Sequence, residues 1–328
     1  MLFLGKRSTT GQGIGLSQLP AMQDSELSWG EVSYRPSGEV TPETEVEITT
    51  GRRGCGNPQC ASSWTAPWRS RKRPIFEGQW GCGGRCVLEM VRTSMRRESS
   101  DGILDAPTQH RHRVPLGLLM HSQGWLTHPQ LQKALEIQKE RGGRIGEILV
   151  AECGVDSDLI TRGLGMQWSR PVLSAGGFSP RLMALVAPRP FLAQSGLLPL
   201  RVAGSSILYV GFEDRLDASS VLALERMSGL KVESGVVKTG EYEEAKAALL
   251  ENAAVDLKEE ILGDVDAVAA RVTAVLEQKQ PVASKLVRFH RHYWLRLWLE
   301  AKAGGGQGVL PVHAEDVFDY VFTAGRLA

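Results

Sequence analysis

A repeated 24-residue pattern constrains the middle of this chain more than any other feature of its sequence. Residues 115–138 form one unit and residues 144–167 form a second, so that matched positions lie 29 residues apart. The matched positions carry a shared glycine, a shared glutamine and apolar pairs: Gly117 and Gly146, Gln138 and Gln167, Leu116 and Ile145, Leu126 and Val155, Leu131 and Ile160, Leu135 and Leu164. Apolar residues at helical spacings predict that each unit forms short helices, and the match predicts a pseudo-two-fold relation between the units.

The residues of the repeat match the tandem motif of a known domain. The second unit carries Arg144, Ile145, Gly146 and Leu149 in the segment RIGEIL, and Gln167 closes it. The first unit, through the segments PLGLLM and GWLTHPQLQKALEIQ, supplies Leu116, Gly117, Gly124, Leu131, Ala134, Leu135 and Gln138. This pattern resembles the MshEN domain, which is the N-terminal domain of type II secretion and type IV pilus assembly ATPases. The resemblance covers about residues 114–250.

The resemblance implies a ligand, because some members of this family bind cyclic di-GMP. Two similar half-sites suit a dianion with two guanines and near two-fold symmetry. An arginine fork pairs with phosphate or with the acceptor edge of guanine, and a glycine lets the ligand approach the backbone closely. On this resemblance the expected ligand-binding residues are Leu116, Gly117, Leu131, Leu135, Gln138, Arg144, Ile145, Gly146, Leu149, Leu164 and Gln167.

The first unit departs from the family pattern at one position. Pro115 stands where the family has arginine, and Arg113 can substitute for it only if the backbone bends differently. The second unit also carries Gly163 where the first has Ala134. Loss of one set of charged hydrogen bonds costs about 1.5–3 kcal/mol. Two interpretations stay open: a partly degenerate cyclic di-GMP site, or two helical pairs that pack through leucines and hold no ligand.

The segment after the repeat, residues 171–252, is predicted to form a small α/β half of the same domain. Residues 196–214 indicate two strands around a turn at Gly204 and Ser205. A helix over 215–229 is expected to end at Gly229, because glycine is the preferred residue just past a helix C-terminus. A further strand over 230–237 and a further helix over 240–254 complete this half.

Four cysteines in two close pairs precede the repeat. Four residues separate Cys55 from Cys60, and three separate Cys82 from Cys86. Four thiolates satisfy the tetrahedral coordination of Zn²⁺, and a unit of about 45 residues does not easily fold without such a metal. Residues 51–100 are therefore predicted to form a treble-clef or zinc-ribbon finger, with one structural zinc and a core of its own. The alternative is four unrelated reduced thiols.

A basic segment in the same unit leaves a different function open. Residues 68–74, WRSRKRP, combine tryptophan with basic side chains that can contact nucleic-acid phosphates or RNA bases. Charge runs more commonly mark solvated faces. A nucleic-acid-binding zinc protein is therefore the alternative from another functional class.

The two ends of the chain and the linker complete the expected organisation, which is α+β and multi-domain. Residues 1–50 are predicted to be a disordered tail and residues 101–113 a linker. Residues 253–328 are predicted to form a C-terminal helical region. Apolar steps of three and four from Leu257 to Val275 predict a long helix, Pro281 starts a second that runs through 283–301, and residues 314–322 predict a short third helix.

The sequence lacks the motifs of common catalytic sites. Neither the Walker A pattern G-x-x-x-x-G-K-[ST] nor the pattern G-x-S-x-G occurs. The net charge of +1 gives no global attraction to nucleic acid or membranes, and the apolar segments fall short of the ~20 residues that span a bilayer. Together with these absences, the resemblance to the MshEN domain implies a cytoplasmic, non-enzymatic regulatory or adaptor protein of a secretion, pilus or motility system. Its expected partner is that machinery or another cytoplasmic protein.

Overall fold

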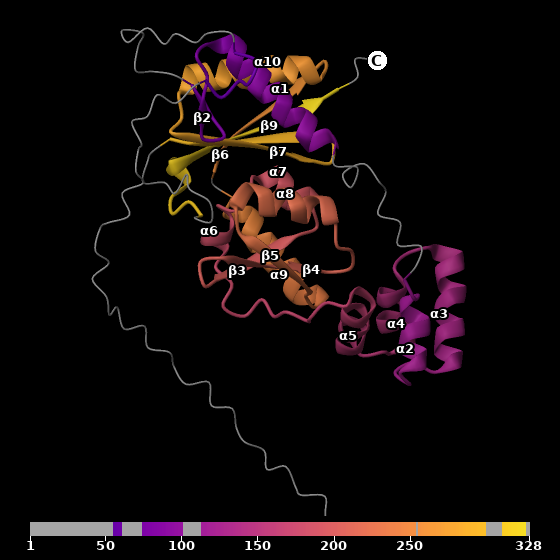
Figure 1. Cartoon of the computed structure of the whole chain (residues 1–328). Coiled ribbons are helices and arrows are strands. Elements are labelled where there is room, and N and C mark those ends of the chain that lie inside the picture. Colours follow the sequence, from indigo (N-terminus) through magenta and orange to yellow (C-terminus); the bar gives the residue numbers. More distant parts are fainter. Residues whose placement is uncertain (1–54, 61–73, 101–112, 254, 300–309, 326–328) are drawn as a thin grey trace, which may run out of the picture. The chain divides into compact units, whose positions relative to one another are not determined.

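The computed structural model describes residues 55–60, 74–100, 113–253, 255–299 and 310–325 (Figure 1). The predicted tail at 1–50, all but the last residue of the predicted linker, and the basic residues at 69–73 lie outside the described residues. The described chain is α+β, as the sequence predicts, with twenty elements from β1 to β9. None of its described helices is both long and apolar enough to cross a membrane.

The tandem repeat folds into four helices that match in pairs. They are α2 (Leu116–Ser122) and α3 (His128–Arg141) in the first unit, and α4 (Ile145–Cys153) and α5 (Ser157–Trp168) in the second. Matching helices begin 29 residues apart, so the predicted short helices are confirmed. Polar caps start α3 and α5, since the side chains of Thr127 and Asp156 each accept a hydrogen bond from a backbone N–H of the first turn.

The α/β half is built on a three-stranded sheet of order β3-β4-β5. Its elements are α6 (Pro180–Met183), α7 (Arg189–Gln194), β3 (Leu198–Ala203), β4 (Ile207–Phe212), α8 (Ala218–Ser228), β5 (Lys231–Val236) and α9 (Thr239–Glu251). β3 and β4 form an antiparallel hairpin, and α8 connects β4 to the parallel strand β5. Gly229 ends α8 in the left-handed conformation, at φ 70°. The strands and helices predicted between residues 196 and 254 are confirmed.

The C-terminal region differs from its prediction, because it is mostly sheet. Its elements are β6 (Asp256–Leu262), α10 (Val265–Lys279), β7 (Ala283–Phe289), β8 (His292–Trp298), a 3₁₀ turn (Ala314–Asp316) and β9 (Val317–Ala324). The sheet has the order β6-β9-β8-β7. The helices predicted over 283–301 and 314–322 are therefore wrong. The remaining predicted helix begins at Val265 rather than Leu257.

Burial on both faces explains why the sequence of β8 does not show the pattern of a strand. Every residue of β8 from Tyr293 to Trp298 is buried, and a strand covered on both faces lacks the polar–apolar alternation that identifies strands. The β7–β8 turn places His290 at φ 49° without the Asn-Gly pair typical of such turns. The true start of α10 is the cap at Asp264, whose side chain accepts from the Ala267 N–H at 2.7 Å.

The cysteine-bearing segment folds together with this C-terminal sheet. It forms the short strands β1 (Ile75–Phe76) and β2 (Gln79–Trp80) and the helix α1 (Gly84–Ser100). The Glu77 N–H donates to the Ser284 carbonyl of β7 at 3.2 Å, and Ser284 Oγ donates to the Ile75 carbonyl at 3.0 Å. Figure 1 shows α1 and α10 together on one face of the sheet.

One hydrophobic core unites these two segments. Its buried residues come from both: Phe76, Val87, Met90, Val91 and Met95 before the repeat, and Val268, Val272, Leu276, Leu286, Leu295 and Phe322 after it. The expectation that the finger has a core of its own is therefore wrong. Among the described residues of this segment, two strands of two residues and one helix offer too little apolar surface for a separate core, and α1 packs on α10 and the sheet instead.

The other face of the four-stranded sheet packs on the α/β half. Because side chains alternate along a strand, Trp294 and Trp298 face this side while Tyr293, Leu295 and Leu297 face α1 and α10. The ring of Phe191, from α7, lies 5.0 Å from that of Phe289 and 5.5 Å from that of Trp294.

A fully buried ion pair lies on the face toward the α/β half. Arg296 and Asp319, register partners on β8 and β9, have side chains that are 2% and 0% exposed. Arg296 Nε lies 2.9 Å from Asp319 Oδ1, and Nη2 lies 2.7 Å from Oδ2. Trp294 Nε1 donates to the same carboxylate at 2.9 Å, and Arg296 Nη1 donates to the Val186 carbonyl at 3.0 Å. The pair therefore fixes the β8–β9 register and connects the sheet to the chain before α7.

Asp319→Asn tests this pair. The substitution keeps the shape of the side chain and leaves the Arg296 charge buried without a counter-charge, which costs about 3–5 kcal/mol. We expect urea unfolding to show a loss of that size. Glu233→Gln is the control, because Glu233 pairs with Lys231 at the surface, and it should leave the unfolding midpoint unchanged. A small effect of Asp319→Asn would show that the pair is dispensable.

His290 gives the fold a predictable pH dependence. Its Nε2 lies 2.6 Å from Oδ2 of Asp217, the N-cap of α8, and this contact raises the pKa of His290 above 6.5. Stabilisation by the protonated imidazole is complete below pH 6.5 and is lost as the pH rises through the raised value. The difference in unfolding free energy between wild type and His290→Gln should therefore be larger at about pH 6 than at about pH 8.

His292 provides a control of opposite sign. Burial lowers its pKa, so the folded protein favours the neutral ring and loses stability as the pH falls. Relative to His292→Gln, the wild type should become less stable as the pH falls toward 6, roughly the range in which histidine titrates. Equal pH trends for the two variants would contradict at least one of the two assignments.

Candidate metal centre and ligand pocket

A backbone knuckle places the first two cysteines. The Cys60 N–H donates to the Asn57 carbonyl at 3.0 Å, which turns the chain back between Cys55 and Cys60. The Gly56 N–H donates to the Trp80 carbonyl at 2.9 Å and holds the knuckle beside β2. The knuckle thus faces the segment that carries the other two cysteines, as the predicted finger requires.

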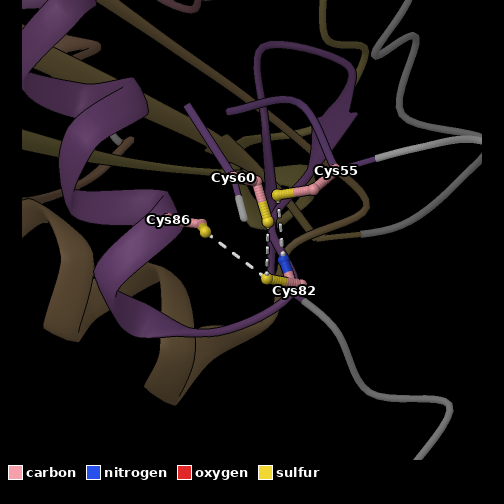
Figure 2. A group of neighbouring side chains, drawn as sticks. All are labelled: Cys55, Cys60, Cys82 and Cys86. Atoms are coloured by element: carbon pink, nitrogen blue, oxygen red, sulfur yellow. Dashed lines mark hydrogen bonds between the residues drawn. The ribbon is translucent and has the colours of Figure 1, made fainter. Parts of the chain in front are cut away.

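The four cysteine sulfurs converge on one point (Figure 2). Cys82 follows β2, and Cys86 lies in the first turn of α1. The Cys82 sulfur lies 3.5 Å from that of Cys60 and 3.3 Å from that of Cys86, and all four sulfurs lie within 4.8 Å of one another. The Cys82 N–H also donates to the Cys55 sulfur at 3.4 Å. The structure therefore brings together all four predicted metal ligands.

The mutual proximity of the thiols controls their ionisation. The contact with Cys86 and burial raise the pKa of Cys82 to about 12. Burial likewise raises the pKa of Cys86. Burial also opposes ionisation of Cys55, but hydrogen bonds from the backbone of Asn57 and Cys82 outweigh it and lower the pKa of Cys55. Four adjacent thiols therefore need a cation to ionise together, and metal binding must release protons.

The donor set fits a tetrahedral metal ion. With metal–sulfur bonds of about 2.3 Å, the edges of a tetrahedron of sulfurs measure about 3.8 Å. The measured separations, from 3.3 Å up to the 4.8 Å limit, bracket this length. Four cysteines close the coordination sphere, so the cluster can hold a metal ion in a structural rather than a catalytic role.

Cys60→Ser should abolish metal binding. It should also destabilise the C-terminal sheet and not only the cysteine-bearing segment. We expect elemental analysis of the wild type to find one zinc per chain, and the variant to lose it. Because α1 shares its core with α10 and the sheet, hydrogen exchange should quicken in α1 and β7 as well. Cys153→Ser, outside the cluster, is the control and should keep the metal. Well under one metal per wild-type chain would contradict the assignment.

The two units of the tandem repeat exchange equivalent contacts. Gln138 Nε2 donates to the Gly143 carbonyl at 3.0 Å, just before the second unit begins. Gln167 Nε2 donates to the Val114 carbonyl at 2.8 Å, just before the first unit begins. Exchange of the units converts one contact into the other, as a pseudo-two-fold relation requires. The prediction that Gln138 and Gln167 occupy equivalent places is confirmed.

The shared glycines serve the packing of helices. A Cβ added at Gly117 would lie 2.6 Å from Leu131 Cδ1, and one added at Gly146 would lie 3.0 Å from Ile160 Cγ2. These are equivalent contacts in the two units, since Leu131 and Ile160 are matched residues. Close approach of α2 to α3, and of α4 to α5, therefore favours glycine at both positions even without a ligand.

A pocket of about 490 Å³ opens beside the second unit. Six of the expected ligand-binding residues line it: Leu116, Arg144, Ile145, Gly146, Leu164 and Gln167. The other five do not. Leu131 and Leu149 lie in the core of the repeat, Leu135 is exposed, Gly117 packs on Leu131, and Gln138 holds Gly143.

The α/β half supplies part of the pocket wall, which the sequence pattern did not predict. Glu213 and Asp214, at the end of β4, and Val237 and Thr239, after β5, line it together with Glu147 of α4. The sequence did contain a signal for this part of the wall. β4 and β5 are parallel, and ligands of α/β sheets bind at the carboxyl ends of parallel strands, where the segment GFED places its two acids.

Arg144 is held by two carboxylates in this pocket. Its Nη1 lies 2.8 Å from Glu213 Oε2, and Nε lies 2.7 Å from Glu147 Oε1. The hydrogen bond to Glu213, with that to Glu147, raises the pKa of Arg144 above its usual value. Burial raises the pKa of Asp214. The pocket thus combines one firmly charged guanidinium with an acidic wall and an apolar floor.

The first unit lacks an equivalent arginine. Pro115 is the N-cap of α2, where α4 has Arg144. Arg113 lies over the Trp168 ring, 3.6 Å from its centroid, and donates to the Gln167 carbonyl at 3.1 Å. It therefore supports the end of α5.

Comparison with known proteins gives partial similarities. No model of a known protein family matches the chain. The chain is 28% identical over 152 residues to the type IV pilus assembly ATPase PilB of Myxococcus xanthus (strain DK1622), across 46% of this chain and 26% of PilB. It therefore spans about a quarter of the length of this curated relative.

Two solved structures are also similar. The structure of MshE with cdg has a TM-score of 0.35 and 22% identity, over 41% of this chain and 98% of that one. The N-terminal domain of XpsE has a TM-score of 0.31 and 15% identity, over 44% of this chain and 97% of that one.

Proposed function

We propose that this chain is a regulatory or adaptor protein of a type II secretion, type IV pilus or motility system. In this proposal its tandem repeat binds cyclic di-GMP in the pocket lined by Arg144 and Gln167. The similarity to PilB and to MshE with cdg supports the class of system and of ligand. The observation that carries the proposal is that the pocket adjoins the unit that keeps both the arginine and the glutamine of the motif.

The remaining parts of the proposal concern the metal, the partner and the absence of catalysis. Four converging cysteines support structural zinc. The partner is proposed to be the secretion or pilus machinery, in the cytoplasm. A non-enzymatic role is proposed because the sequence carries no Walker A motif.

A protein–protein scaffold without nucleotide is the second candidate. Two observations favour it: carboxylates already engage Arg144, and helix packing favours the glycines of the motif without a ligand. The nucleic-acid alternative depends on the basic segment at 69–73, outside the described residues. It predicts affinity that falls steeply with salt.

Calorimetric titration with cyclic di-GMP tests the leading proposal. We expect saturable binding by the wild type and none detectable for Arg144→Ala, because the charged fork is lost. Arg141→Ala is the control, since Arg141 is exposed and pairs with Glu152 at 3.6 Å. Pro115→Arg should tighten binding by restoring the arginine of the first unit. Absence of binding in both the wild type and Pro115→Arg would leave the scaffold as the function.

A further inference from the structure

The Arg144–Glu213 ion pair is a contact between the tandem repeat and the α/β half. Arg144 occupies the N-cap position of α4, and Glu213 follows the end of β4. Their 2.8 Å contact is partly shielded, because the Glu213 side chain is only 14% exposed. A charged hydrogen bond in such surroundings is stronger than one at the open surface.

Charge in the pocket opposes an anionic ligand while this pair is intact. Three acids, Glu147, Glu213 and Asp214, share the pocket with a single lining cation, Arg144. A phosphate that pairs with Arg144 through Nε or Nη1 competes with a carboxylate for that donor, because Nε donates to Glu147 and Nη1 contacts Glu213. Displacement also leaves Glu213 in a partly buried position without its counter-charge, which carries a desolvation cost.

Other contacts hold α5 to the α/β half independently of Arg144. Trp168 Nε1 donates to the Asp214 carbonyl at 2.9 Å, and the Trp168 ring packs against Phe212 at 5.5 Å. Asp158 of α5 pairs with Lys238 at 2.7 Å. Loss of the Arg144–Glu213 pair would therefore remove this contact between the start of α4 and the end of β4 while α5 stays in place.

We infer that Glu213 is a built-in competitor for the nucleotide at Arg144. The inference rests on the proposed function of the pocket. When Glu213 holds Arg144, the first turn of α4 is attached to the end of β4 and the arginine is occupied. When a phosphate or guanine edge takes Arg144, this attachment is released. Nucleotide binding and attachment of α4 to the α/β half thus exclude each other, which converts ligand binding into a structural signal.

Titration of full-length Glu213→Gln with cyclic di-GMP tests this competition. Glutamine keeps the size of the side chain and removes its charge, so we expect about tenfold tighter binding than in the wild type, the effect of one charged hydrogen bond. Asp158→Asn is the matched control. It removes one negative charge from the other ion pair across the same boundary, and its affinity should equal that of the wild type. Thermal unfolding should show that all three proteins are folded.

A second measurement tests the attachment without any ligand. Hydrogen exchange over residues 145–150 should be faster in Glu213→Gln than in the wild type. It should be unchanged in Glu147→Gln, which removes the carboxylate that pairs with Arg144 within α4 itself. Equal exchange rates in all three proteins would contradict the inference that the Arg144–Glu213 pair attaches α4 to the α/β half.

The outcomes separate this inference from the proposed function. Tighter binding by Glu213→Gln supports both, and so does binding by Glu213→Gln alone, which would mean that competition is complete in the wild type. If the wild type binds cyclic di-GMP and Glu213→Gln binds it no more tightly, the inference that Glu213 competes for Arg144 is wrong, and the proposed nucleotide function stands. If neither folded protein binds, both are overturned.

Discussion

The buried pair of Arg296 and Asp319 is the constraint on which the arrangement of the sheet depends. Moving two charges into an apolar interior is costly unless every polar atom finds a partner. Here the carboxylate accepts from Arg296 and Trp294, and the guanidinium also reaches the Val186 carbonyl. A shift of β9 by one residue would place Asp319 on the opposite face and leave both charges unpaired. The pair therefore selects one register and one packing of the sheet on the α/β half.

A second buried carboxylate connects the cysteine-bearing segment to the same arrangement. Glu98, near the end of α1, is 1% exposed. Its Oε2 accepts from Arg226 of α8 at 3.1 Å and from the Arg288 N–H of β7 at 3.3 Å. Through Glu98, α1 is therefore held to α8 of the α/β half and to β7 of the sheet, in addition to the packing of its apolar face. The cysteine cluster lies at the first turn of this helix, so a metal bound there would stabilise a core that includes the C-terminal strands.

Local signals were sufficient in the tandem repeat and for the strands and helices between residues 196 and 254. The repeat, the β3–β4 turn at Gly204 and the end of α8 at Gly229 followed from period, turn residues and capping. The cysteine cluster followed from spacing, because only four thiols in two close pairs needed to be recognised. β7, β8 and β9 could not be predicted in this way, since their apolar residues reflect partners on both faces that are distant in sequence. The shared core of α1 and α10 was hidden for the same reason.

The candidate pocket shows the same limit at a functional site. Motif resemblance identified Arg144 and Gln167, which the second unit carries in its own sequence. It could not show that Glu213 engages Arg144, because that contact depends on how the repeat meets β4. The motif also could not separate ligand contacts from packing contacts, and Gly117 and Gly146 are explained by the approach of Leu131 and Ile160. Residues of a motif can therefore serve the packing of its helices, while an acid contributed from the end of a neighbouring strand engages its arginine.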